Sequence, residues 1–205
     1  MANNDEQKNK SPLANRGPKY LNFPVDEYTP VCIIAYMVAP LKPNPKFSKD
    51  TTPIPSVRFL LAGRVNDPDN NNEPTVVRKW TGWKSISYNE KSGLVNLFKG
   101  VPCEEILQDD KEGGKLWTTP FKALLELSKD GKYTNITRVK LGDDVGQMDI
   151  CYTAEIEKTL FKTVKAYAGE VPLEVAVIKM PDGVKKFFPA DLQDAPKYDD
   201  ENNDD

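Results

Sequence analysis

The chain has 205 residues, 39% of them hydrophobic and 29% charged, and its formal net charge at pH 7 is −3. No stretch approaches the roughly 18 consecutive apolar residues of a membrane-spanning helix. The first residues also lack the basic-then-apolar order of a secretory signal. The sequence therefore predicts a soluble, reduced, cytoplasmic protein with no membrane partner.

Histidine is absent, which excludes imidazole bases, Ser-His and Cys-His nucleophile pairs and HExxH zinc sites. The three cysteines (Cys32, Cys103 and Cys151) lie far apart and form no CxxC, so they indicate neither a disulfide framework nor a thiolate metal site. Asp67, Asp69 and Glu73 lie in an Asn-rich loop without the order of a calcium-binding EF-hand, and no glycine-rich phosphate loop is present. We therefore expect no enzyme, no metal and no cofactor.

Charge is distributed unevenly along the chain. Residues 191–205 hold seven acids and one base, a net charge of −6, which leaves +3 on residues 1–190. The sequence predicts a disordered arm at 1–19, a single β domain at 20–190 and a disordered acidic tail at 191–205, because neither end shows apolar periodicity. The tail is either an interaction element or a solubilising end, and its composition is compatible with both.

Strand patterns dominate the first half of the domain. Residues 31–39 form a continuous apolar run between two prolines, as in a strand that is covered on both faces. After a proline-rich loop at 41–55, residues 57–65 alternate between apolar and polar side chains, which is typical of a half-buried strand. Asn, Asp and Pro predict a turn at 66–74, and a third strand is expected at 75–87.

The second half continues with short elements. Gly82 suggests a bulge or sharp bend within the third strand, and a helical turn is expected at 90–98. Asp130-Gly131 predicts a hairpin, since it lies between alternating segments at 121–127 and 133–139. About eight short strands with one helical turn indicate an all-β barrel or sandwich. The remaining expected strands are 148–156, 159–166, 171–178 and 184–188, the last two joined by a turn at 181–183.

Basic side chains and an indole ring are expected on one face of each of two neighbouring strands. Arg58 and Arg64 share one face of the second expected strand, and Arg78, Trp80 and Lys84 share one face of the third. If these strands pair, the combined surface suits single-stranded nucleic acid. Each base can stack on an aromatic ring, worth about 1–3 kcal/mol, while Lys and Arg neutralise the phosphates.

Tyr88, Tyr133 and Arg138 could extend this surface. The structural alternative is that Trp80 and Trp83 anchor the core and the charges form an ordinary solvated face. Both interpretations stay open from the sequence.

Several short motifs are distributed over about residues 29–141. They are Asn44-Pro45-Lys46-Phe47, Val57-Arg58-Phe59 with Ala62-Gly63, Lys79-Trp80, Asn89-Glu90-Lys91-Ser92-Gly93-Leu94 with Phe98-Lys99-Gly100, and Asp130-Gly131-Lys132-Tyr133-Thr134-Asn135-Ile136. These motifs resemble those of a family of small phage-encoded proteins, the OB-fold-like group of phage replication and recombination modules. Members of that group are generally regarded as single-stranded DNA-binding proteins.

The resemblance implies an all-β protein built as an OB-like small β-barrel with one short helical turn, and the strand patterns add extra C-terminal strands and disordered tails. Its implied function is sequence-nonspecific binding of single-stranded DNA during phage replication or recombination, in the cytoplasm of the infected bacterial host. We expect Arg58, Arg64, Arg78, Trp80 and Lys84 to line the groove, with Tyr88 and Arg138 at its ends.

The acidic tail resembles that of bacterial and phage single-strand binding proteins, with one departure. Those tails usually finish in an apolar residue that docks on partner proteins, whereas this one finishes in Asn-Asn-Asp-Asp. An electrostatic role is therefore expected, and recruitment of replication or recombination proteins stays open, as does the oligomeric state.

Two other functions are compatible with the same composition. One is a virion structural protein, either a capsid decoration or a tail component, without a nucleic-acid role. The other is an inhibitor of a host enzyme whose acidic tail imitates nucleic acid.

Overall fold

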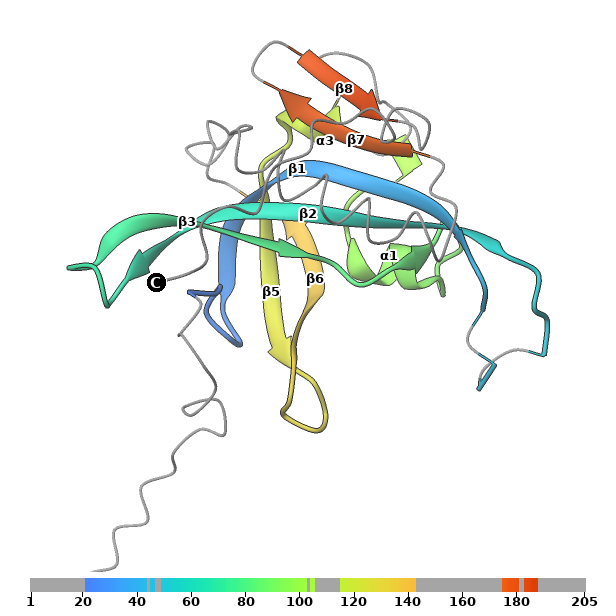
Figure 1. The fold of residues 1–205 in the computed structure, drawn as a ribbon, viewed down its shortest axis with the longest axis horizontal. Coiled ribbons are helices and arrows are strands. Elements are labelled where there is room, and N and C mark those ends of the chain that lie inside the picture. The colour runs from blue at the N-terminus through green and yellow to red at the C-terminus, as the bar shows by residue number, and fades with distance from the viewer. Residues whose placement is uncertain are drawn as a thin grey trace, which may run out of the picture.

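The computed structural model describes residues 21–43, 45–46, 49–102, 104–105, 115–142, 175–180 and 183–187. Strands dominate these residues, and short helices lie between the fourth and fifth strands (Figure 1). In chain order the elements are β1 (Tyr28–Leu41), β2 (Ile54–Asp67), β3 (Glu73–Trp80), β4 (Lys84–Ser85), α1 (Gly93–Leu97), α3 (Lys115–Thr118), β5 (Phe121–Leu127), β6 (Thr134–Leu141), β7 (Val175–Met180) and β8 (Gly183–Phe187).

The strands form an antiparallel sheet whose main path runs β3-β2-β1-β5-β6. The long strand β1 joins two hairpins, because its residues 28–31 pair with β5 and its residues 32–41 pair with β2. The β5–β6 hairpin consequently lies across β2 and β3 in Figure 1. β7 pairs with β1 on the side away from β2 and carries β8, while the short β4 pairs with β2.

The core lies between the β1–β2–β3 strands and the β5–β6 hairpin. Phe59 of β2 and Phe121 of β5 both contact Phe98, which follows α1, with ring centroids 5.1 and 6.2 Å apart. α3 adds Leu116 and Trp117, and the Trp117 ring stacks on Tyr36 of β1 at 5.9 Å. Aromatic contacts therefore link both hairpins and both helices.

The two ends of the sheet approach each other without backbone pairing in the described residues. β3 and β6 are joined instead by a side-chain hydrogen bond, in which Nζ of Lys79 donates to Oγ1 of Thr134 at 2.8 Å. Lys79 lies on the core side of β3, opposite Leu61, and is half-buried. This burial lowers its pKa, because desolvation disfavours the ammonium form.

The expected all-β class is confirmed, but within the described residues the strands do not close into a hydrogen-bonded barrel. The helical turn expected at 90–98 is α1, and α3 is an additional helix that the sequence patterns did not predict. The strand expected at 75–87 is divided into β3 and β4. Over the described part of the chain, no helix is both long and apolar enough to cross a bilayer.

Four predicted segments lie outside the described residues. They are the terminal arm and tail, 1–19 and 191–205, and the expected strands 148–156 and 159–166. The expected C-terminal hairpin corresponds to β7 and β8.

Candidate nucleic-acid interface

The register between β2 and β3 places the predicted arginines and Trp80 on one face. Trp80 lies opposite Leu60, and Arg78 lies opposite Ala62. Directly paired residues in antiparallel strands point to the same side, and side chains alternate along each strand. The even-numbered residues of both strands therefore lie on the face opposite Phe59 and Leu61, and on this face Leu60 and Ala62 are also buried. The expected pairing of these strands is confirmed, and the residues that we call the β2–β3 outer face are Arg58, Arg64, Arg78, Trp80 and Trp83.

Arg58 is the anchor of this face and not an exposed cation. Its guanidinium carbon lies 4.3 Å from the centroid of the Trp80 ring and 4.9 Å from that of Trp83. Its Nη2 atom also contacts the Met37 sulfur at 3.4 Å, and only 7% of the residue is exposed. Arg58 therefore does not line a groove as a solvent-exposed cation, because its side chain is buried with both indole rings packed against it. Arg58 instead fixes the positions of both rings.

The segment after Trp80 contains the bulge that Gly82 suggested. Trp80 pairs with Leu60, whereas Lys84 pairs with Val57, so residues 81–83 contain one more residue than the facing stretch of β2. The extra residue reverses the alternation of side chains. Lys84 therefore lies on the core side with Val57, and its predicted place beside Trp80 is wrong. Trp83 takes the place on the outer face instead.

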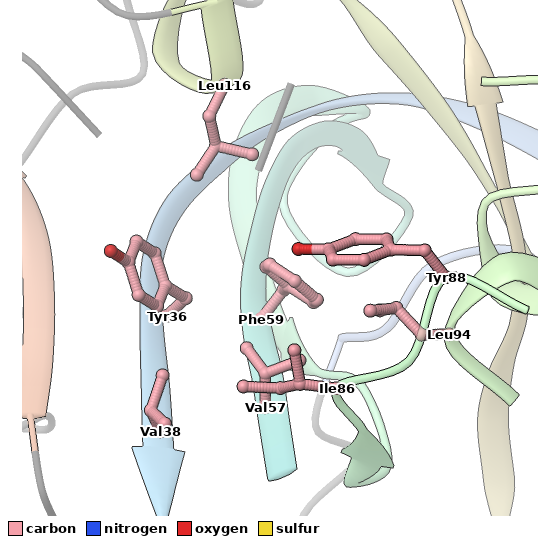
Figure 2. Close-up of a pocket in the computed structure, with 8 residues that line it drawn as sticks. All are labelled: Tyr36, Val38, Val57, Phe59, Ile86, Tyr88, Leu94 and Leu116. Atoms are coloured by element: carbon pink, nitrogen blue, oxygen red, sulfur yellow. The ribbon is translucent and has the colours of Figure 1, made fainter. Parts of the chain in front are cut away.

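Tyr88 also lies on the core side. It is half-buried and lines an apolar cavity of about 140 Å³. Figure 2 shows its ring beside Phe59 and Leu94, with the hydroxyl directed past Phe59 toward the side of the cavity where Tyr36 and Leu116 lie. The prediction that Tyr88 ends the same groove as Trp80 is therefore wrong. The cavity is lined by Tyr36, Val38, Val57, Phe59, Ile86, Tyr88, Leu94 and Leu116.

Arg138 is exposed on β6, away from the β2–β3 outer face. It pairs with Leu124, while the neighbouring Val139 is buried in the core, so Arg138 points outward from the β5–β6 hairpin. Lys140, two residues further along, holds its Nζ 3.7 Å from the centroid of the Tyr28 ring. The structure therefore separates Arg138 from Arg64, Arg78 and Trp80, which it brings together.

Two aromatic contacts of this surface were not assigned from the sequence. The face on which Trp83 lies depends on whether the chain bulges at Gly82. The glycine suggests such a bulge but does not establish it. The contact of Tyr28 with Lys140 joins residues 112 positions apart, and only the alternation of basic residues on β6 could have pointed to it.

Among the described residues, no group of three Cys, Asp or Glu side chains is arranged to hold a metal ion.

No protein-family model, curated protein or solved structure matches the chain. The function proposed below is therefore based on the geometry of this surface.

Proposed function

We propose that the protein binds single-stranded DNA without sequence preference through the β2–β3 outer face, in phage replication or recombination. The observation that carries the proposal is the register that sets Arg64, Arg78 and Trp80 on the same face of β2 and β3, with Arg58 stacked against two indole rings. No acidic residue occurs at 56–66 or 74–80. Within these two segments the strands offer a polyanion cations and an aromatic ring, while their carboxylates, Asp67 and Glu73, are paired with each other at the turn end of the hairpin.

Each side chain has a distinct part in this proposal. The ring of the partly buried Trp80 would stack on a base, and such stacking is tolerant of sequence because every base has a π-face. Arg64 and Arg78 would neutralise phosphates, and Arg58 would keep the two rings in place. The strand order adds support, because OB folds bind oligonucleotides on the face of their second and third strands.

The test is a fluorescence anisotropy titration of labelled oligo-dT with the full chain over a series of salt concentrations. The logarithm of the affinity should fall with the logarithm of the salt concentration, by about 0.7 for each neutralised phosphate. The double variant Arg64→Gln/Arg78→Gln should lower the size of this slope by about 1.4. The matched control is Lys91→Gln/Lys99→Gln, which removes two exposed cations beside α1 and should leave the slope unchanged.

Three results would count against the proposal. Absence of binding at low salt would reject it and favour a virion structural role. Equal loss of slope in both double variants would place the contact elsewhere. Tighter binding to an oligo-U of the same length would make RNA the ligand.

A further inference from the structure

The end of β3 that carries Trp80 adjoins the start of β6. Lys79, between Arg78 and Trp80 in the chain, donates a hydrogen bond from its Nζ to Thr134 Oγ1 at 2.8 Å. Asn22 Nδ2 donates to the same hydroxyl oxygen at 3.3 Å. A lysine side chain spans only a few ångströms, so the two strand ends are neighbours across a narrow gap, which we call the β3–β6 seam.

Tyr133 stands at this seam with its side chain in solvent. It precedes Thr134 directly, and at 66% exposed it is the most exposed large hydrophobic residue in the described part of the chain. Its backbone is held on both sides, since its N–H donates to Ser128 Oγ at 3.0 Å and its carbonyl accepts from the Ser128 N–H at 2.7 Å. A ring on a fixed backbone is a suitable platform for stacking, because little freedom is lost on binding.

Beyond the seam, the outer side of the β5–β6 hairpin is basic. Arg138 and Lys140 project from β6, and Lys122, which pairs with Lys140, projects from β5. Glu126 is the only acid on the outward-facing side of these two strands. Lys140 is already held over the Tyr28 ring, so its ammonium group has a defined position on the surface.

We propose that the DNA path continues from the β2–β3 outer face across the β3–β6 seam onto β6, with Tyr133 stacking on a base at the seam and with Arg138 and Lys140 binding the following phosphates. This inference rests on the proposed function and adds a second contact area to it. From Thr134 to Lys140 the strand adds about 20 Å of surface, at about 3.3 Å per residue. A longer oligonucleotide is therefore needed to fill the path than to cover β2 and β3 alone.

The experiment compares labelled oligo-dT of about six and about sixteen nucleotides, both within the range of site sizes seen for one OB fold. Tyr133→Ala should weaken binding of the long oligonucleotide roughly tenfold, while binding of the short one changes less than twofold. Tyr133→Phe keeps the ring and should bind both as the parent chain does. Arg138→Gln/Lys140→Gln should reduce the salt slope for the long oligonucleotide only.

The outcomes separate this inference from the proposed function. Failure of the parent chain to bind either oligonucleotide rejects the proposed function. Normal binding of both by the parent chain, with no length-dependent loss in either set of variants, rejects only the path across the seam. Thermal unfolding of each variant checks its fold, and Tyr133→Phe distinguishes loss of the ring from loss of structure.

Discussion

The carbonyl oxygen of Pro30 on β1 occupies the space that a Cβ atom on Gly63 of β2 would need, at a distance of only 2.5 Å. Val31 Cγ1 and Phe23 Cε1 lie 3.2 Å from the same point. This close approach occurs where the pairing of β1 changes from β2 to β5. The absence of a side chain at residue 63 therefore lets β1 cross close to β2 as it passes from one hairpin to the other.

Gly63→Ala should be strongly destabilising for this reason. The backbone oxygen of Pro30 cannot move aside as a flexible side chain would, so we expect a loss of about 1–3 kcal/mol or more in the free energy of unfolding. Urea denaturation measures the loss. Gly82→Ala is the matched control, because nothing lies within 4 Å of a Cβ atom at that position. Equal stability of the two variants would contradict the crossing geometry.

The stack of Arg58 on Trp80 changes what a Trp80 substitution should do. If the Trp80 ring only stacked on a base, Trp80→Ala would weaken DNA binding by about 1–3 kcal/mol and leave the melting temperature nearly unchanged. Because the Trp80 ring covers a buried guanidinium, we now expect a loss of unfolding free energy as well, of about 1–2 kcal/mol.

A double-mutant cycle separates the stack from general loss of packing. Arg58→Met and Trp80→Ala should show a coupling energy of about 1 kcal/mol, since each removes the same contact. The losses of unfolding free energy caused by Arg64→Met and Trp80→Ala should simply add, because Arg64 lies four residues along β2 from Leu60, the residue that pairs with Trp80. Coupling of similar size in both cycles would mean that the effect is not specific to the Arg58 stack.

Lys79 should make stability depend on pH in the alkaline range. Its pKa in the folded chain is lowered below the ordinary value of 10.5 by burial. In the window between the lowered pKa and 10.5, the unfolded chain binds more protons than the folded chain. Ionisation of Lys79 therefore destabilises the folded chain at lower pH, and this destabilisation decreases as the pH rises through the window.

Lys79→Met isolates this contribution. The parent chain should gain stability relative to Lys79→Met as the pH is raised toward 10.5, as measured by urea denaturation at several pH values. Lys91→Met, at an exposed site, serves as the control and should run parallel to the parent chain. A constant difference between the parent and Lys79→Met at every pH would show that burial does not shift this lysine.

The central strands could be predicted from alternation, whereas their ends could not. The apolar run at 31–39 predicts a strand bounded by two prolines, whereas β1 includes both Pro30 and Pro40. Pro30 pairs with Lys122 and Pro40 with Pro55, and at each of these positions the described residues provide β1 with a partner strand on one side only. A proline is compatible with such a position, because its missing N–H can face the unpaired side.

The sequence predicts which β2 residues lie on the outer face, but it does not predict how far they are buried. Alternation along β2 assigned Arg58 and Arg64 correctly to one side, yet it does not say whether that side is covered. Leu60 and Ala62, on the same side between the two arginines, are buried and were the available signal. Beyond Trp80 the alternation no longer predicts the face correctly, because a single extra residue reverses it. As a result Trp83 lies on the outer face and Lys84 lies on the core side.

The acidic tail should compete with DNA for the basic surface. Residues 191–205 carry −6 and residues 1–190 carry +3, so at low salt the tail should be attracted to the β2–β3 outer face. A tethered competitor can reach an effective concentration in the millimolar range when its linker is flexible. The attraction should fade as salt shortens the Debye length to about 8 Å at physiological ionic strength.

Deletion of residues 191–205 should therefore tighten binding to oligo-dT, and by a larger factor at low salt than at high salt. Replacing the seven acids of this segment with Asn or Gln should reproduce the deletion, because the competition depends on charge and not on particular side-chain contacts. Thermal unfolding should be the same for all three chains, which separates the effect from a change in fold. If the affinity of the truncated chain matches that of the parent across the salt series, the tail is a solubility element and does not occupy the DNA site.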